Sequence, residues 1–357
     1  MVLRAPGGSV ALESNLMLAP IAGWCEHAWR VAVRKVGGVG LACTDLLSPT
    51  GLICGSEASK DLAHTSGEDQ PIGMQLYGSD PGVMAEGAVW CAEHGATVVD
   101  INMGCPVDKV CKKDGGSKLM CNLPNTFAIF ERVRAELPGT IPLTAKMRLG
   151  WDEDAKRDGV AGELARGLCE RGAACITVHG RTTEQRFKGS CDHDGIARVV
   201  DMVNDATNGT VPVLGNGDVK SAMDVVAMRA NTGCAGVMIG RGAFGDPFIF
   251  RKAWALQQRI DALGIDPKDT ESVARIDLSD VVPSDDEVLD LVLDYFERMI
   301  ETRSERHAMH VIRQKISWLG KTIRDGHSKA LKESIRTAKD PDEVRWVIGD
   351  WRTGERA

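Results

Sequence analysis

Short apolar runs that alternate with amphipathic segments constrain the fold of this 357-residue chain more than any other feature. The runs are mostly apolar throughout, as expected for parallel strands that are buried on both faces. Eight strands are predicted, at 16–22, 41–47, 71–77, 98–103, 142–149, 175–179, 212–214 and 236–239. Helical periodicity is found between them, for example at 83–94, 161–171, 196–204 and 222–230.

Eight strand–helix units predict an α/β fold of the (β/α)8 or TIM-barrel type. A doubly wound open sheet is the alternative, but no GxGxxG follows the first strand, which favours the barrel. We therefore expect a barrel catalytic domain over residues 1–255. An acidic linker or excursion is expected over 256–284, and a smaller all-α domain over 285–357.

Composition is typical of a globular protein and argues against a membrane span and against a zinc or iron–sulfur site. The chain is 43% hydrophobic and 26% charged, and no apolar run approaches the ~18 residues of a membrane span. The first residues do not resemble a signal peptide, so a cytoplasmic protein is expected. Eleven cysteines without CxxC pairs indicate free thiols rather than a zinc or iron–sulfur site. His307 and His310 share a helix face without a third ligand nearby, and we expect no bound metal.

Charge is distributed unevenly along the chain. The net charge is −7, which argues against a wholly basic nucleic-acid binder. Residues 261–290 carry ten acidic and two basic side chains, whereas residues 303–339 carry ten basic and three acidic ones. The basic segment has the right sign to bind a phosphate backbone, although a solvated helix face is the simpler explanation for it.

Polar residues follow almost every predicted strand. In a barrel the carboxyl ends of the strands converge on one face, where active sites are built. Core packing does not require Gln, Lys, His or Arg at these positions. In chain order the polar sets are Ala19 to Gly23, Thr44-Asp45, Gln75, Asn102 with Cys105, Lys146 with Arg148, His179 with Arg181, Gly215 to Asp218, and Gly240 to Gly242.

Two glycine-rich turns follow the last two strands. Backbone N–H groups in the GNGD turn (215–218) and the GRG turn (240–242), with Arg241 beside them, are typical of a phosphate cradle. Two ordinary tight turns would have the same composition. The phosphate could belong to a cofactor or to a sugar-phosphate substrate.

Lys146 lies within an apolar strand and must meet an anion or acceptor there, or have a lowered pKa. It could hold negative charge on a reduced flavin ring or form a Schiff base, and a strand-end lysine that reaches solvent is the third possibility.

Cys105 stands between Gly104 and Pro106 at the end of the strand 98–103, with lysines and glycines after it. A cysteine displayed there could serve as a proton donor or a nucleophile. A small buried hydrophobic residue is the alternative, since free cysteine is often buried.

The order of several segments resembles the tRNA-dihydrouridine synthase family, in its bacterial branch. The segments are APIAG (19–23), GMQLYGSDP (73–81), DINMGCPVDKV (100–110), TAKMRLGW (144–151), VHGRTTEQRFKG (178–189), VLGNGD (213–218) and GVMIGRGAFGDP (236–247). The basic C-terminal helices resemble the tRNA-binding domain of that family more loosely. Ile21, Asp45, Thr183 and Cys191 depart from the usual pattern.

The resemblance implies a flavoprotein with FMN as cofactor and NADPH as reductant, which reduces the C5=C6 bond of a uridine in tRNA. Cys105 would be the general acid, because a thiol with a pKa near ~8.5 is mostly protonated at neutral pH. Asn102, Arg148 and Arg181 would contact the substrate. The residues that would bind FMN are Pro20, Ile21, Ala22, Gln75, Lys146 and His179 for its ring and ribityl chain, and Asn216, Gly217, Asp218, Gly240 and Arg241 for its phosphate.

Residues 303–339 would then grip the tRNA while the target base is splayed out into the barrel mouth. We expect a monomer. Two other interpretations stay open: a flavin barrel that acts on a small pyrimidine, and a tRNA-binding protein without enzymatic activity.

Overall fold

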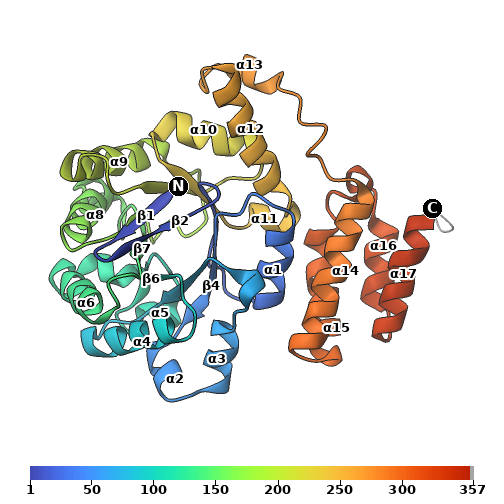
Figure 1. Cartoon of the computed structure of the whole chain (residues 1–357), viewed down its shortest axis with the longest axis horizontal. Helices are drawn as coiled ribbons and strands as arrows, with labels where there is room; N and C mark the ends of the chain where they lie inside the picture. Colours follow the sequence, from blue (N-terminus) through green and yellow to red (C-terminus); the bar gives the residue numbers. More distant parts are fainter. Residues whose placement is uncertain (354–357) are drawn as a thin grey trace.

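The structure is a computed structural model that describes residues 1–353, residue 325 in its backbone alone. Within this described part, eight parallel strands close into a barrel in the order β10-β3-β4-β5-β6-β7-β8-β9 (Figure 1). β10 pairs with β9 on one side and with β3 on the other, which closes the sheet. This closure confirms the predicted (β/α)8 barrel and excludes the open sheet. The strands are β3 Leu16–Leu18, β4 Leu41–Leu47, β5 Ile72–Leu76, β6 Val98–Met103, β7 Leu143–Arg148, β8 Cys175–His179, β9 Val213–Asn216 and β10 Gly236–Ile239.

Four strands (β4, β6, β8 and β10) have the predicted bounds, and β5 and β7 are each one residue shorter at both ends than predicted. β3 and β9 differ more at their C-terminal ends. β3 stops at Leu18 rather than at residue 22, because Pro20 has no N–H to donate to a neighbouring strand. β9 continues to Asn216 rather than stopping at 214. Asn216 therefore belongs to the barrel wall, and its side-chain Nδ2 donates to the carbonyl oxygen of Met238 on β10 (2.7 Å).

Helices form the outer layer around the barrel (Figure 1). Side chains cap the N-terminal turns of some of them: Asp80 accepts from the N–H of Val83, and Ser221 forms a capping box with Asp224. The longer helices are α1 His27–Lys35, α4 Pro81–Glu93, α6 Leu123–Glu136, α8 Val160–Glu170, α9 His193–Thr207, α10 Ala222–Thr232 and α12 Ile249–Leu263. Shorter ones are α2 Pro49–Ile53, α3 Glu57–Ala63, η1 Gly67–Asp69, α5 Asp108–Cys111, η2 Gly116–Cys121, α7 Glu153–Arg157 and α11 Gly242–Gly245.

An N-terminal β-hairpin, β1 Val2–Ala5 and β2 Gly8–Ala11, covers the end of the barrel where the strands begin (Figure 1). Leu3 and Leu12 are buried and join the apolar cluster inside the barrel. We predicted no element for these residues. The hairpin leaves the opposite end of the barrel, where the strands finish, as the accessible one.

The acidic segment after the barrel contains more helix than expected. The expected start of the linker, residue 256, falls inside α12, because Leu256, Gln257 and Ile260 are buried on that helix. A short helix, α13 Thr270–Ala274, follows, and residues 275–284 then run to the next helix (Figure 1).

The C-terminal helices pack together beside the barrel (Figure 1). They are α14 Asp285–Thr302, α15 Glu305–Leu319, η3 Ile323–Gly326, α16 Lys329–Thr337 and α17 Pro341–Thr353. Ser284 and Glu287 form a capping box at the expected start of α14. The expected helical domain runs to residue 357, and its last four residues lie outside the described residues. In the described chain, we find no helix with the length and apolar character that a membrane span requires.

Candidate active site

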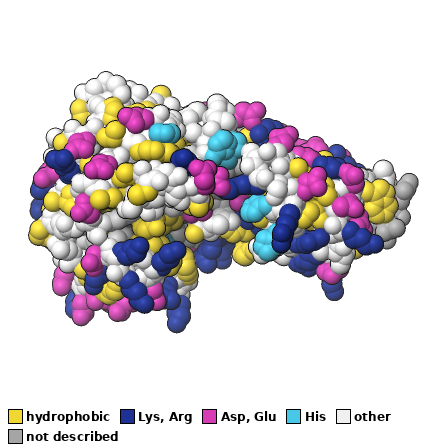
Figure 2. Space-filling view, turned by 90° about the horizontal axis from the view of Figure 1, so that it is seen from below, with side chains coloured by type: hydrophobic (Ala, Val, Ile, Leu, Met, Phe, Trp, Pro, Cys, Tyr) yellow, Lys and Arg dark blue, Asp and Glu magenta, His cyan; other side chains and the backbone are white. Residues whose placement is uncertain are grey.

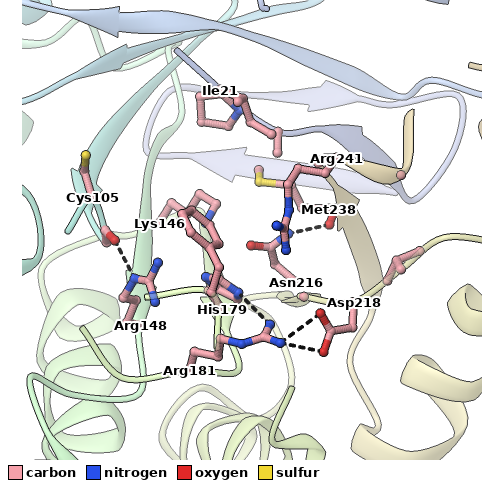
Figure 3. Close-up of a pocket in the computed structure, with 18 of the residues that line it drawn as sticks. Ile21, Cys105, Lys146, Arg148, His179, Arg181, Asn216, Asp218, Met238 and Arg241 are labelled. Atoms are coloured by element: carbon pink, nitrogen blue, oxygen red, sulfur yellow. Dashed lines mark hydrogen bonds and ion pairs between the residues drawn. The ribbon is translucent and has the colours of Figure 1, made fainter. Parts of the chain in front are cut away.

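A cavity of about 990 Å³ opens at the end of the barrel where the strands finish. Its wall is built from the loops that follow the strands, as in other barrels of this type. Most of the residues that the sequence singled out line it, which explains why polar groups follow each strand. They are Pro20, Ile21, Ala22, Asn102, Cys105, Lys146, Arg148, His179, Arg181, Asn216, Gly217, Asp218, Gly240 and Arg241. Figure 3 shows Cys105 on one side, Arg241 on the other and Lys146 between them.

Gln75, expected at a flavin ring, does not line the cavity and is fully buried below it. Its amide Nε2 donates to Asp100 (2.6 Å), and its Oε1 accepts from Asn102 (2.6 Å). Thr144 donates to the other oxygen of Asp100 (2.5 Å). This buried chain of hydrogen bonds supports the strand ends from below.

Cys105 is held by a turn whose shape depends on Asn102. The side-chain oxygen of Asn102 accepts from the backbone N–H groups of Gly104 (3.1 Å) and Cys105 (2.9 Å). The Asn102 amide is thus occupied within the protein, although we expected it at a substrate. Burial raises the pKa of the Cys105 thiol, and nearby Arg148 and Lys146 only partly oppose this. The thiol is therefore protonated at neutral pH and suited to donate a proton.

Lys146 points into the cavity from β7, beside Asn102 of the neighbouring strand. Burial, followed by repulsion from Arg148, lowers the pKa of its amine to about 8. The group is a cation at neutral pH but close to the point of losing its proton. A cation buried in the wall of the cavity can stabilise negative charge on a ligand.

Arg148 ties together the loops on either side of it. Its Nε donates to the carbonyl of Gly104 (2.7 Å, Figure 3), and its Nη1 donates to the carbonyls of Thr182 (2.8 Å) and Arg186 (2.9 Å). Within the described residues Nη2 has no acceptor, which leaves it for a ligand. Arg148 thereby positions the turn of Cys105 and can still reach a substrate.

The Arg181 guanidinium makes more hydrogen bonds within the protein than the Arg148 guanidinium does. It donates to both carboxylate oxygens of Asp218 (2.9 and 2.7 Å) and to the carbonyls of Lys188 (3.0 Å) and Gly189 (2.6 Å). It also lies 3.5 Å from His179 Nε2 (Figure 3). We expected Arg181 at the substrate, but these contacts favour a role in fixing the loop 181–189 to the GNGD turn.

In this network His179 is neutral at neutral pH, whereas Asp218 is ionised. Burial, reinforced by Lys146 and the arginines around it, lowers the pKa of His179, so the ring is neutral at neutral pH. Burial acts to raise the pKa of Asp218, but the bonds from Arg181 and the Cys191 N–H outweigh it and hold that pKa below its usual value. Asp218 is therefore ionised and already paired.

The two glycine turns offer unpaired N–H groups. Among residues 1–353, the backbone N–H groups of Asp218, Val219, Arg241 and Gly242 donate to no protein atom. The turns also pack closely, since a Cβ at Gly242 would lie 2.2 Å from the carbonyl oxygen of Val219. The Arg241 guanidinium has no carboxylate partner in the described chain and lies over the Phe187 ring (4.7 Å). This donor set fits a phosphate group.

Sequence reasoning missed the part of the rim that comes from the helical region. Trp318, at the end of α15, and Lys321 both line the cavity, as do Phe187 and Lys220. Trp318 is 38% exposed. No sequence signal distinguishes it, because its position depends on how α15 packs against the barrel.

A family model described as dihydrouridine synthase (Dus) matches residues 17–348, which cover both the barrel and the C-terminal helices. The chain belongs to the dihydrouridine synthase family. The match confirms the resemblance drawn from the motifs, and it extends that resemblance through α15 and α16 to within α17.

Curated members of the dihydrouridine synthase family are similar over most of the chain. The tRNA-dihydrouridine synthase B of Shewanella oneidensis is 36% identical over 245 residues, which cover 69% of this chain and 72% of that protein. A probable tRNA-dihydrouridine synthase of Mycobacterium tuberculosis is 33% identical over 353 residues (96% and 83%). The one from Rickettsia conorii is 28% identical over 347 residues (97% and 96%). Among solved structures, mandelate oxidase with benzoyl-formic acid is 20% identical, with a TM-score of 0.45 and coverage of 76% and 77%.

Proposed function

We propose that this protein is a tRNA-dihydrouridine synthase that uses FMN and NADPH to reduce the C5=C6 bond of a uridine in tRNA. The observation that carries the proposal is the composition of one cavity. A protonated thiol, Cys105, faces the same space as the cation of Lys146 and the unpaired N–H groups of the glycine turns. The printed names of the relatives supply the substrate class.

The residues present fit FMN. The turns at 217–219 and 241–242, together with Arg241, would hold its phosphate through N–H groups that have no protein partner in the described chain. Pro20, Ile21 and Ala22 would line one side of the ring. A Cβ at Gly240 would lie 2.9 Å from Ile21 Cδ1, so a side chain there would crowd this part of the cavity. Reduced FMN supplies the hydride in this chemistry.

The protein supplies the proton and the electrostatics. Hydride arrives at C6 of the uracil, the C5=C6 π bond breaks, and negative charge develops on C5 and the adjacent carbonyl. Cys105 Sγ–H then gives its proton to C5, and the thiolate is reprotonated from solvent. The Lys146 cation stabilises negative charge in the cavity, and Arg148 keeps the Cys105 turn in place through Gly104.

Dihydrouridine formation in unmodified tRNA, with purified protein, FMN and NADPH, tests this function. General acid catalysis contributes roughly 10²–10⁴-fold to a rate, so Cys105→Ala should form product more slowly by a factor in that range. Its flavin content should equal that of the wild type. Cys191→Ala is the matched control, because burial also raises the pKa of that thiol (to about 11) but Cys191 does not line the cavity.

Two results would contradict the proposal. Equal rates in Cys105→Ala and wild type would move the proton donor elsewhere. A protein that binds FMN but reduces free uracil or orotate and no tRNA would favour the small-molecule flavin barrel instead.

A further inference from the structure

The helical region reaches the cavity at one place, formed by Trp318 and Lys321. Both residues line the cavity, together with residues of the barrel loops. Lys321 packs on α11: a Cβ at Gly245 would lie 3.1 Å from Lys321 Cδ. Its Nζ lies 3.8 Å from the centroid of the Trp318 ring. A cation and an aromatic ring thus stand side by side at the rim.

Packing against the barrel fixes the orientation of the Trp318 ring. Trp24, in the segment between β3 and α1, and Phe244, on α11, stack at 3.7 Å, and each meets Trp318 in a T-shaped contact with a centroid distance of 6.4 Å. Lys315 Nζ lies 4.6 Å from the centroid of the Trp24 ring. The ring of Trp318 is therefore held in place while 38% of the residue stays exposed.

Positive charge continues from this rim onto the helical region. Among the side chains that the structure describes, no carboxylate pairs with Lys321 or Lys332. A Cβ at Gly320 would lie 2.9 Å from Lys332 Cε, so Lys332 of α16 packs against the residue that precedes Lys321. Burial, followed by repulsion from Arg336 and Lys321, lowers the pKa of Lys332. Figure 2 shows Lys and Arg side chains, interspersed with Asp and Glu, along the lower edge of both the barrel part and the helical part.

We propose that Trp318 and Lys321 form a subsite for the nucleotide next to the reduced uridine, with the ring of Trp318 against its base or ribose and Lys321 on its phosphate. The subsite rests on the proposed function. A base that has left its stack exposes its neighbours, and aromatic rings beside cations are the general means by which proteins hold unstacked nucleotides. The subsite would align the RNA backbone so that the uridine reaches Cys105.

Binding of an unmodified tRNA transcript to the FMN-loaded protein tests the subsite. Trp318→Leu removes the aromatic ring on which a base would stack. Loss of one such stacking contact should weaken the binding of tRNA roughly tenfold. Trp318→Phe should retain most of the affinity, because it keeps an aromatic face and the packing against Trp24. Lys321→Ala should reduce the slope of log affinity against log salt by about 1, as expected for one lost phosphate contact. Trp346→Leu, on α17 and 51% exposed, is the matched control and should bind as the wild type does.

Flavin content and the rate of flavin reduction by NADPH without RNA should be unchanged in all four variants. If the wild type forms dihydrouridine but both Trp318→Leu and Lys321→Ala bind tRNA normally, the subsite proposal fails and the proposed function stands. The subsite is also overturned if Lys321→Ala loses flavin and keeps its RNA affinity, because Lys321 would then belong to the cofactor. It falls as well if Trp318→Phe binds as weakly as Trp318→Leu at an equal thermal midpoint. A wild type that binds tRNA and forms no dihydrouridine overturns the proposed function itself.

Discussion

Cys105 depends on two residues that lie further along the chain. Gly116 has φ +60°, and a Cβ there would lie 2.7 Å from the carbonyl oxygen of Cys105. That carbonyl accepts from both the N–H and the hydroxyl of Ser117 (3.1 Å each). Gly116 is therefore needed for close approach of its loop to the Cys105 turn. The sequence showed the glycines beside the cysteine but not this contact, because backbone atoms make it.

Titration of Lys146 should make the affinity of the cavity for FMN depend on pH. The pKa of its amine lies at about 8, below its ordinary 10.5, so the cation is present below pH 8 and is lost as the pH rises above it. A hydrogen bond from a charged group contributes about 1.5–3 kcal/mol, so FMN affinity should fall roughly tenfold or more from pH 7 to pH 9.5. Quenching of flavin fluorescence measures this affinity.

Two substitutions at the same position provide the controls. Lys146→Met should bind FMN weakly with an affinity that no longer falls over this pH range, and Lys146→Arg should keep its charge at pH 9.5. A wild-type affinity that is flat from pH 7 to 9.5 would show that the Lys146 charge makes no contribution to binding.

Elements with a strong hydrophobic pattern could be predicted from the sequence, and those that depend on tertiary contacts could not. The strands 41–47, 98–103, 175–179 and 236–239 agree with the structure residue for residue. Their apolar runs reflect burial on both faces, which is a local property of the chain. The N-terminal hairpin has only short, partly exposed strands and gains its apolar contacts from the barrel interior, so no local pattern indicated it.

The hairpin can be tested as an element. Leu3 is fully buried against the barrel interior, and Leu3→Ala should lower the free energy of unfolding by about 2–5 kcal/mol. Because the hairpin lies away from the cavity, the affinity for FMN measured well below the thermal midpoint should not change. Val2→Ala is the control, since that side chain is 42% exposed. Equal thermal midpoints for Leu3→Ala and Val2→Ala would show that the hairpin does not contribute to the core.

At the scale of the whole molecule, a buried polar junction joins the barrel to the helical region. Lys315 of α15 donates to Glu26 (2.7 Å), at the start of α1, and to the hydroxyl of Tyr295 on α14 (2.9 Å). Tyr295 in turn donates to Glu26. Salt bridges Lys35–Asp294 (2.5 Å) and Arg298–Glu68 (2.8 Å) lie on the same side of the barrel.

Removal of one partner from this junction should destabilise the protein. Lys315→Met leaves the Glu26 carboxylate, whose side chain is only 17% exposed, without its cation. Removal of one partner from a buried ion pair costs about 3–5 kcal/mol. The thermal midpoint should therefore fall in Lys315→Met and recover in part in the double variant Glu26→Gln/Lys315→Met. Calorimetry measures both. A double variant with a midpoint lowered by the sum of the two single changes would mean that the residues do not interact.

How the helical region packs against the barrel could not be predicted from the sequence. Helix existence and the positive charge of residues 303–339 could be predicted from periodicity and composition. The placement of Trp318 and Lys321 at the rim could not, because it follows from a junction between residues such as Glu26 and Lys315 that are far apart in the chain. Gln75, which we expected at the flavin ring, is held in hydrogen bonds to Asp100 and Asn102, and these partners could not be read from the sequence.

The hairpin that covers one end of the barrel has a kinetic consequence. If the proposed function holds and ligands reach the cavity only through the end where the strands finish, a nicotinamide and a uridine would share one opening and occupy it at different times. Reductant would then leave before RNA enters, and turnover would proceed by substituted-enzyme kinetics. The N-terminal residues would in this way set the order of events at the opposite end of the barrel.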